Sequence, residues 1–179
     1  MTMDILRHFA HCPKCAKNLP APPPAPNRID CPHCGFCCYF NPGAAVACFV
    51  TRADGKVLFI RRAKEPALGR LAPPGGFVDA GETAEQAVVR EICEEVGLQL
   101  GPLEFLCSQP NDYLYKDILY TVLDLFFVAP MTGSVGGVDV DEVQSVLWLD
   151  PLSVDPKAMA FQSMTDALIA LQSRVSEER

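Results

Sequence analysis

The sequence has no apolar run long enough to cross a membrane as a helix. Its most apolar stretch, residues 118–129, is short and is interrupted by Asp124, whereas a spanning helix needs about 20 apolar residues. The first residues, MTMDILRHFAHC, also lack the basic segment, apolar segment and small-residue cleavage site of a secretion signal. We therefore expect a cytoplasmic protein with no membrane partner.

Positive charge is also scarce. The 179 residues include 15 Lys and Arg against 22 Asp and Glu, which gives a formal net charge of −7. A protein that binds nucleic acid through a broad basic face has the opposite imbalance, so we do not expect a nucleic-acid partner. The content of 49% hydrophobic and 21% charged residues is typical of a globular protein. Excess acid suits carboxylates that hold a divalent cation, but it also suits an ordinary cytosolic protein.

The composition changes near residue 43, which predicts two domains, 1–42 and 43–179. The first part holds six of the nine cysteines and a stiff proline tract at residues 20–26. The second part has apolar runs of the length and alternation of strands, with Asp54-Gly55 as a hairpin turn. These runs predict strands over residues 45–51, 56–61, 103–107, 119–128 and 145–149.

Two segments have helical periodicity. The first spans residues 84–96, with Thr83 as N-cap, Gln86 completing a capping box, and Gly97 just after the end. The second is amphipathic and spans about residues 161–173. Strands covered by two helices predict the α+β class, arranged as an α/β/α sandwich.

The first helix has an acidic face. Glu91, Glu94 and Glu95 fall within one arc of about 100°, and apolar residues on the other side can pack on a sheet: Val88, Val89, Ile92, Cys93 and Val96. Carboxylates at these spacings repel one another, and a hard divalent cation such as Mg²⁺ would remove the conflict. The structural alternative is a solvated acidic stripe.

The surrounding residues resemble the Nudix box at every fixed position. The order is Gly76, five residues, Glu82, seven residues, and then the run Arg90-Glu91-Ile92-Cys93-Glu94-Glu95-Val96-Gly97-Leu98. The resemblance implies a Nudix fold over roughly residues 44–175 and hydrolysis of a diphosphate linkage with Mg²⁺ or Mn²⁺. It also implies metal binding by Glu91, Glu94, Glu95 and the Gly75 carbonyl.

Residues around these ligands have expected supporting roles. Gly75 and Gly76 allow a tight, close backbone approach, and Glu82 and Arg90 can pair to hold the carboxylates in position. Nudix enzymes often use a further carboxylate from a loop, and the candidate is Glu142, six positions before Trp148. The alternatives here are Asp139, Asp141 or a plain acidic loop.

Two CxxC pairs, Cys12–Cys15 and Cys31–Cys34, have the spacing of a structural four-cysteine Zn²⁺ site. The alternatives are unrelated buried cysteines or a redox pair, and the latter lacks a βαβ context. Four cysteines saturate zinc without His11 or His33. Cys37 and Cys38 lie just beyond the second pair.

A zinc ribbon followed by a Nudix domain resembles the NADH pyrophosphatase branch and related FAD or ADP-ribose hydrolases. Ser108-Gln109-Pro110 begins that branch's Ser-Gln-Pro-Trp-Pro-Phe-Pro signature, and residues 111–115 depart from it, which puts NADH specificity in question. The candidate substrate-binding residues are Gln109, Tyr113, Tyr115 and Phe161. For the tyrosines, an ordinary place in a strand is an equal alternative to substrate binding. For Phe161 and the neighbouring Ser163, the alternative is that they begin a packed helix.

We expect a pyrophosphohydrolase acting on a small nucleoside-diphosphate-linked substrate of the ADP-ribose, NADH or FAD class, with a homodimer as the candidate assembly. The alternative is a nucleotide-sensing module whose ribbon contacts nucleic acid or protein, and a capped-RNA hydrolase is a third reading. The intact box favours an enzyme.

Overall fold

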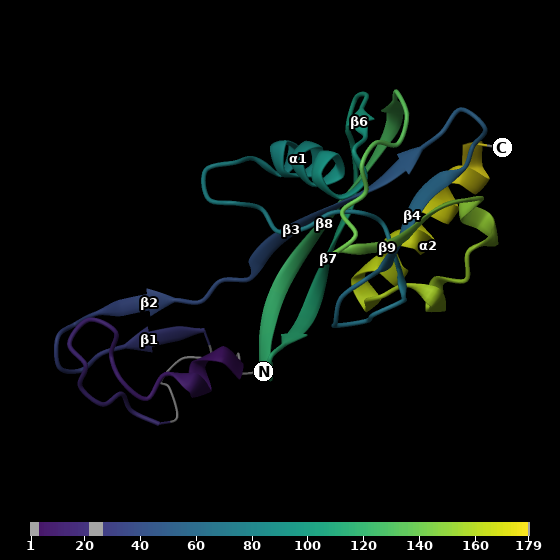
Figure 1. Cartoon of the computed structure of the whole chain (residues 1–179). Coiled ribbons are helices and arrows are strands. Elements are labelled where there is room, and N and C mark those ends of the chain that lie inside the picture. Colours follow the sequence, from purple (N-terminus) through teal and green to yellow (C-terminus); the bar gives the residue numbers. More distant parts are fainter. Residues whose placement is uncertain (1–3, 22–26, 179) are drawn as a thin grey trace. The chain divides into compact units, whose positions relative to one another are not determined.

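The computed structural model describes residues 4–21 and 27–178, which form two compact units (Figure 1). The first unit comprises the chain up to Gly43 together with residues 112–122, and the second comprises the remainder. Residues 22–26 of the proline tract lie outside the described residues. Within the described part of the chain, no helix combines the length and apolarity that crossing a membrane would require.

The first unit is built on a small antiparallel pair. It contains the 3₁₀ helix η1 (Asp4–His8) and the strands β1 (Arg28–Asp30) and β2 (Cys37–Tyr39), in which Ile29 lies opposite Cys38. Among its described residues the buried apolar side chains are few, namely Leu6, Ile29 and Val122 with Cys12 and Cys31. A core this small needs an additional staple to be stable.

The second unit contains a mixed sheet with the strand order β5-β4-β3-β8-β6, with β9 paired to β4 and β7 paired to β8. The bounds are β3 Gly43–Thr51, β4 Val57–Arg62, β5 Leu71–Ala72, β6 Gln99–Leu100, β7 Glu104–Tyr115, β8 Ile118–Thr132 and β9 Val143–Leu149. β4 and β9 are antiparallel, with a register shift at Arg61 and Arg62. The tip of the β7–β8 hairpin belongs to the first unit.

Two helices cover opposite faces of this sheet (Figure 1). On one face, α1 (Ala84–Val96) packs on the side chains of Val46, Cys48 and Leu58. On the other, α2 (Gln162–Glu178) packs on Phe49 and Phe59. Successive strand residues point to opposite faces, so these runs are apolar throughout. The α+β class and the α/β/α arrangement are confirmed. Two short 3₁₀ helices, η2 (Pro151–Ser153) and η3 (Pro156–Ala158), precede α2.

The helix predicted over residues 84–96 has those bounds, and both capping-box hydrogen bonds are present. Gly97 is left-handed, with φ of 63°. The prediction of its buried face was partly wrong, because Val89 and Cys93 are exposed whereas Glu95 is buried. The helix is rotated about its axis so that the arc containing Glu95, and not the arc of Val89 and Cys93, faces the sheet.

Candidate functional site

Residues 73–76, here called the glycine loop, follow β5 and lie beside the first half of β3. Val46 N donates to Gly76 O at 2.8 Å, and Cys48 N donates to Pro74 O at 3.0 Å. Gly75 has φ of +149°, and a Cβ there would collide with the Val46 carbonyl and lie 2.6 Å from Ala47 Cα. Both obstacles are backbone atoms of a buried strand, so only glycine fits at position 75.

The Glu95 side chain points from α1 to this loop. It is 5% exposed, and its Oε2 accepts a hydrogen bond from Gly75 N at 2.9 Å. Burial raises the pKa of Glu95 to about 8, and the charges of Glu91 and Glu142 add to the increase. The Gly75 N–H and Arg62 oppose that increase. Glu95 is therefore a buried carboxylate with two like-charged neighbours.

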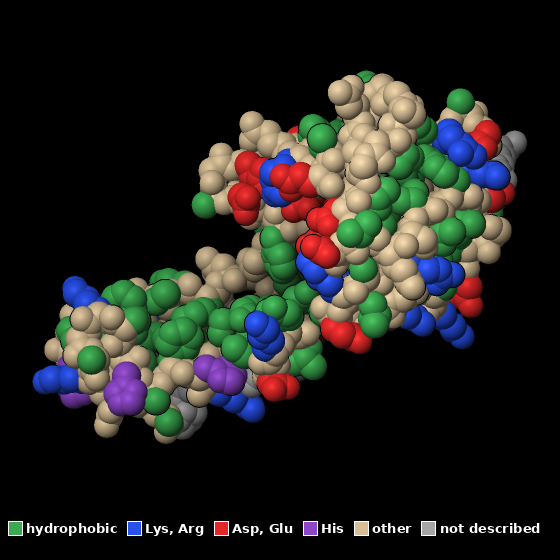
Figure 2. Space-filling view, in the orientation of Figure 1, with side chains coloured by type: hydrophobic (Ala, Val, Ile, Leu, Met, Phe, Trp, Pro, Cys, Tyr) green, Lys and Arg blue, Asp and Glu red, His purple; other side chains and the backbone are tan. Residues whose placement is uncertain are grey.

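Glu91 and Glu94 are the other two carboxylates of the acidic face. Burial raises the pKa of Glu91, and the charges of Glu94 and Glu142 raise it further. Arg90 Nη1 donates to Glu91 at 2.8 Å and to Glu94 at 3.2 Å. The Glu94 side chain is 61% exposed, so the three carboxylates range from buried to solvated. Figure 2 shows acidic side chains gathered over α1, with basic side chains among them and beside them.

Arg90 also makes the predicted pair with Glu82, which is confirmed. Its Nη2 lies 2.5 Å from Glu82 Oε1, and its Nε lies 3.2 Å from Oε2. A third donation, from Nη2 to Phe77 O, is 3.0 Å long. The hydrogen bond from Arg90 lowers the pKa of Glu82. A two-point guanidinium–carboxylate contact is geometrically specific, so it fixes the loop before α1 against the helix.

Glu142 is the loop carboxylate whose charge raises the pKa of both Glu91 and Glu95. Its Oε1 forms an ion pair with Lys64 Nζ at 2.6 Å. Asp139 has a local role, because its N donates to Glu95 O at 3.0 Å and its Oδ1 accepts from Asp141 N at 2.9 Å. Of the three candidates in this loop, Glu142 is therefore the one whose charge acts on both Glu91 and Glu95.

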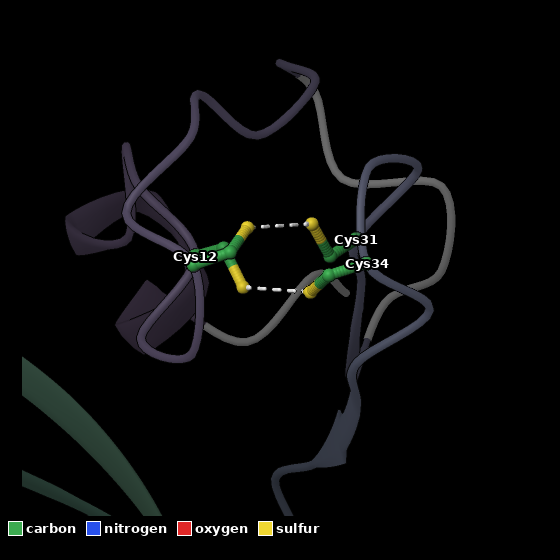
Figure 3. A group of neighbouring side chains, drawn as sticks. Cys12, Cys31 and Cys34 are labelled. Atoms are coloured by element: carbon green, nitrogen blue, oxygen red, sulfur yellow. Dashed lines mark hydrogen bonds between the residues drawn. The ribbon is translucent and has the colours of Figure 1, made fainter.

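The four cysteines of the CxxC pairs converge. Their Sγ atoms all lie within 4.8 Å of one another, with 3.7 Å between Cys12 and Cys34 and 3.6 Å between Cys15 and Cys31 (Figure 3). Tetrahedral zinc with Zn–S bonds of about 2.3 Å would place sulfurs about 3.8 Å apart. The cluster therefore has the dimensions of a four-cysteine zinc site.

The backbone around the cysteines supports that interpretation. Ala16 N donates to Cys12 O and Gly35 N donates to Cys31 O, so the two CxxC turns repeat one geometry. Burial raises the pKa of Cys31, but hydrogen bonds from the backbone of His33 and Cys34 outweigh it and bring the pKa to about 7. The Phe36 N–H lowers the pKa of Cys34, but burial and the neighbouring cysteines outweigh it and bring the pKa to about 12, so the metal-free cluster shares its protons unequally. Thiolate is the form that binds metal.

Among the described residues, these cysteines are the one group of three or more His, Cys, Asp or Glu side chains whose ligand atoms converge in this way. Glu91, Glu94 and Glu95 share a helix, but their carboxylate oxygens do not converge in this way. Arg90 binds the first two, and the Gly75 N–H binds the third.

The substrate-contact candidates lie in both units. Tyr113 and Tyr115 belong to the first unit, and their rings stack at 6.3 Å with 25° between planes. Gln109 lies in β7 of the second unit, where its side chain hydrogen-bonds Cys107. Phe161 is in contact with Arg62, whose guanidinium carbon lies 5.3 Å from the ring centroid.

Ser163 does not have the geometry of a substrate contact. It is 1% exposed, and its Oγ donates to Asp124 Oδ2 at 2.6 Å. Burial raises the pKa of Asp124, and hydrogen bonds from Ser163 and Asn111 oppose the increase. This residue is a structural part of the start of α2, as the alternative interpretation held.

Sequence reasoning missed Lys64 and Arg62, and it named Asp124 only as a break in an apolar run. Asp124 had a visible signal, because it is the one charged residue within the apolar run of residues 118–129 and a buried charge needs partners. Lys64 and Arg62 carry no local signal beyond being cations at the end of a strand in an acidic chain.

The comparisons with known proteins agree on one family. The chain matches the NUDIX domain over residues 41–168. It is 52% identical over 97 residues to the ADP-ribose pyrophosphatase of Methanocaldococcus jannaschii, which is 53% of this chain and 54% of that protein. It is 30% identical over 167 residues to the NAD-capped RNA hydrolase NudC of Pseudomonas aeruginosa, which is 92% of this chain and 56% of that protein. The chain thus spans about half the length of the curated relatives it matches.

A solved structure extends the likeness to nearly the whole chain. A NUDIX hydrolase from Nitrosomonas europaea superposes with a TM-score of 0.69 at 25% identity, over 96% of this chain and 92% of that chain.

Proposed function

The chain belongs to the NUDIX family, and from this we propose that it is a divalent-metal-dependent hydrolase of the diphosphate linkage in nucleoside-diphosphate-linked compounds. The observation that carries the proposal is the intact box in its folded form. Glu91 and Glu95 are neighbouring carboxylates with raised pKa values beside a glycine loop, and the Arg90–Glu82 pair holds the helix to the preceding loop.

The carboxylates fit a hard cation. Two neighbouring carboxylates with raised pKa values are costly as bare charges, and a divalent ion with oxygen ligands would compensate them. Glu91, Glu94, Glu95 and the Gly75 carbonyl would hold Mg²⁺ or Mn²⁺. When bound, such an ion neutralises diphosphate charge and lowers the pKa of a bound water.

The chain's own residues then position the reaction. The Gly75 N–H orients Glu95, and Arg90 links Glu91 to the Glu82 pair. Glu142 would accept the proton of the attacking water, because it is the loop carboxylate within electrostatic reach of both helix carboxylates. Addition of one water across the P–O–P linkage gives two phosphate monoesters.

The substrate class follows from the relatives and the candidate contacts. One relative is an ADP-ribose pyrophosphatase and another an NAD-capped RNA hydrolase. Both names refer to substrates with an adenosine diphosphate moiety. We propose ADP-ribose, NADH and FAD as substrates, with Tyr113 or Tyr115 stacking on the base and Gln109 and Phe161 as further contacts.

The first part of the chain is proposed to be a structural zinc ribbon. Residues 1–42 would fold around Zn²⁺ held by the four cysteines, with residues 43–179 as the catalytic domain. The small apolar core of this unit would depend on the ion for its stability. A cytoplasmic location and a homodimer are proposed as well.

Purified protein should be incubated with ADP-ribose, NADH, FAD, ADP-glucose, NAD-capped RNA and nucleoside triphosphates, with Mg²⁺ or Mn²⁺, and the products separated by chromatography. We expect AMP from several of the small ADP-linked compounds. Cleavage of capped RNA alone would change the substrate class, and cleavage of nucleoside triphosphates alone would refute it. No hydrolysis of any compound would favour a nucleotide-sensing module.

A further inference from the structure

Lys64 is a cation set among carboxylates beside the candidate site. It lies in the segment after β4, and its Nζ is 2.6 Å from Glu142 Oε1. The hydrogen bond to Glu142 raises the pKa of Lys64, and the charges of Glu142, Asp139 and Asp141 raise it further. The Asp139 carboxylate has another partner, because its Oδ1 accepts a hydrogen bond from Asp141 N. The charges of all three acidic residues of the loop therefore act on Lys64, and Lys64 binds one of these residues, Glu142.

The backbone brings this pair together. Ala63 N donates to Glu142 O at 2.9 Å. This backbone hydrogen bond holds Lys64, the next residue, close to Glu142. The loop is fastened in turn to α1, because Asp139 N donates to Glu95 O and Val143 N donates to Asp139 O. Lys64 and Glu142 are 78 positions apart in the sequence, but their side chains form a direct hydrogen bond.

Without a cation here, Glu142 would be repelled from the site it serves. Its carboxylate is half-exposed, at 44%, and is free to turn to solvent. Glu91 and Glu95 are like charges that interact with it, and Asp139 and Asp141 lie in the same loop. Lys64 binds Oε1, and within the described residues no hydrogen bond is made by Oε2. One oxygen is thus held and the other is left for chemistry.

We propose that Lys64 is a positioning residue that holds the Glu142 carboxylate at the helix carboxylates, so that Glu142 and not a neighbouring aspartate takes part in hydrolysis. This inference rests on the proposed function. Lys64 acts through Glu142 and does not bind substrate. Its removal lowers kcat and leaves KM nearly unchanged, because the substrate loses no contact.

The test is a double-mutant cycle measured on ADP-ribose with saturating Mg²⁺. The variants are Lys64→Met, Glu142→Gln and the two combined, with Lys64→Arg as the conservative variant. The matched control is Lys157→Met, which removes another exposed lysine. Urea unfolding of each variant, followed by the fluorescence of Trp148, verifies that the fold is retained.

We expect Lys64→Met to lower kcat by about tenfold, a part of the 100-fold or greater contribution of an acid–base residue. Lys64→Arg should restore most of the loss, and Lys157→Met should behave as wild type. In the Glu142→Gln background, Lys64→Met should have no further effect, because the residue it positions is already disabled.

The contrary results are distinguishable. If the fold-reductions in kcat from Lys64→Met and Glu142→Gln multiply in the double variant, or if Lys64→Met raises KM, Lys64 contacts the substrate. The inference is then overturned while the hydrolase proposal stands. If Glu142→Gln alone leaves kcat unchanged, Glu142 has no role for Lys64 to support. If the wild-type protein hydrolyses none of the compounds, the proposed function fails and the inference fails with it.

Discussion

Replacing Glu95 by glutamine should make the protein more stable and less active at once. Glu95 is 5% exposed, it accepts a hydrogen bond from Gly75 N, and the charges of Glu91 and Glu142 raise its pKa. Glutamine has the same shape and keeps an oxygen for the Gly75 N–H, but it has no charge. The substitution Glu95→Gln therefore removes the cost of burying a charge beside two other carboxylates, and it also removes the proposed metal ligand.

The size of the effect follows from the pKa. Burial raises the pKa of Glu95 to about 8, whereas a glutamate in an unfolded chain titrates near 4.3. Between these values the folded protein holds a proton that the unfolded chain does not, so the free energy of unfolding falls as the pH rises from about 4 through about 8. At about 1.4 kcal/mol for each tenfold change in the protonation equilibrium, the upper limit is about 5 kcal/mol at pH 9.

The assay is urea unfolding of protein dialysed free of Mg²⁺, followed by the fluorescence of Trp148 in β9, at pH 5 and pH 9. Glu95→Gln should remove most of the loss that wild type suffers between the two pH values. Turnover with Mg²⁺ should fall on the order of 100–1,000-fold, as when one electrostatic stabilising group is lost. Glu94→Gln, whose parent side chain is 61% exposed, is the stability control and should change little. A Glu95→Gln protein no more stable than wild type at pH 9 would refute the reasoning.

Three further outcomes are expected. Gly75→Ala should lower the free energy of unfolding by about 1–3 kcal/mol more than Gly81→Ala, because both have positive φ but only the former meets the backbone of β3; equal urea midpoints would contradict this. Ser163→Ala should lower the free energy of unfolding by about 1–3 kcal/mol, because the buried Asp124 carboxylate loses a hydrogen-bond donor. Ser173→Ala is an exposed control in the same helix. A change in KM without a change in melting temperature would instead indicate substrate contact. Metal analysis of Mg²⁺-free protein should find about one zinc per chain, lost in Cys31→Ser, and a zinc content near zero in the wild-type protein would rule out the ribbon.

Local features of this fold were predictable because their causes are local. Thr83, Gln86 and Gly97 define the ends of α1, and the helix has the predicted bounds. The turn at Asp54–Gly55 joins two strands whose bounds agree within two residues. The ends of β7 and α2 were less well predicted, since β7 continues to Tyr115 and α2 to Glu178. Neither end has a strong stop signal in the sequence.

The long-range features were not predictable from spacing. Helical periodicity placed Glu91, Glu94 and Glu95 together, but it could not give the rotation of α1 on the sheet, which buries Glu95 and exposes Val89. The pairing of Lys64 with Glu142 depends on how two distant loops meet. The two-residue strands β5 and β6 are too short to produce a pattern of their own.

The most direct test of the account is the release of AMP from ADP-ribose as a function of Mg²⁺ concentration, measured for wild type and for Glu95→Gln. The wild-type protein should release AMP and ribose 5-phosphate in equal amounts, only when Mg²⁺ is present, and the variant should release almost none. Release that is independent of Mg²⁺, or equal in the two proteins, would contradict the claim that this helix holds the metal for diphosphate hydrolysis.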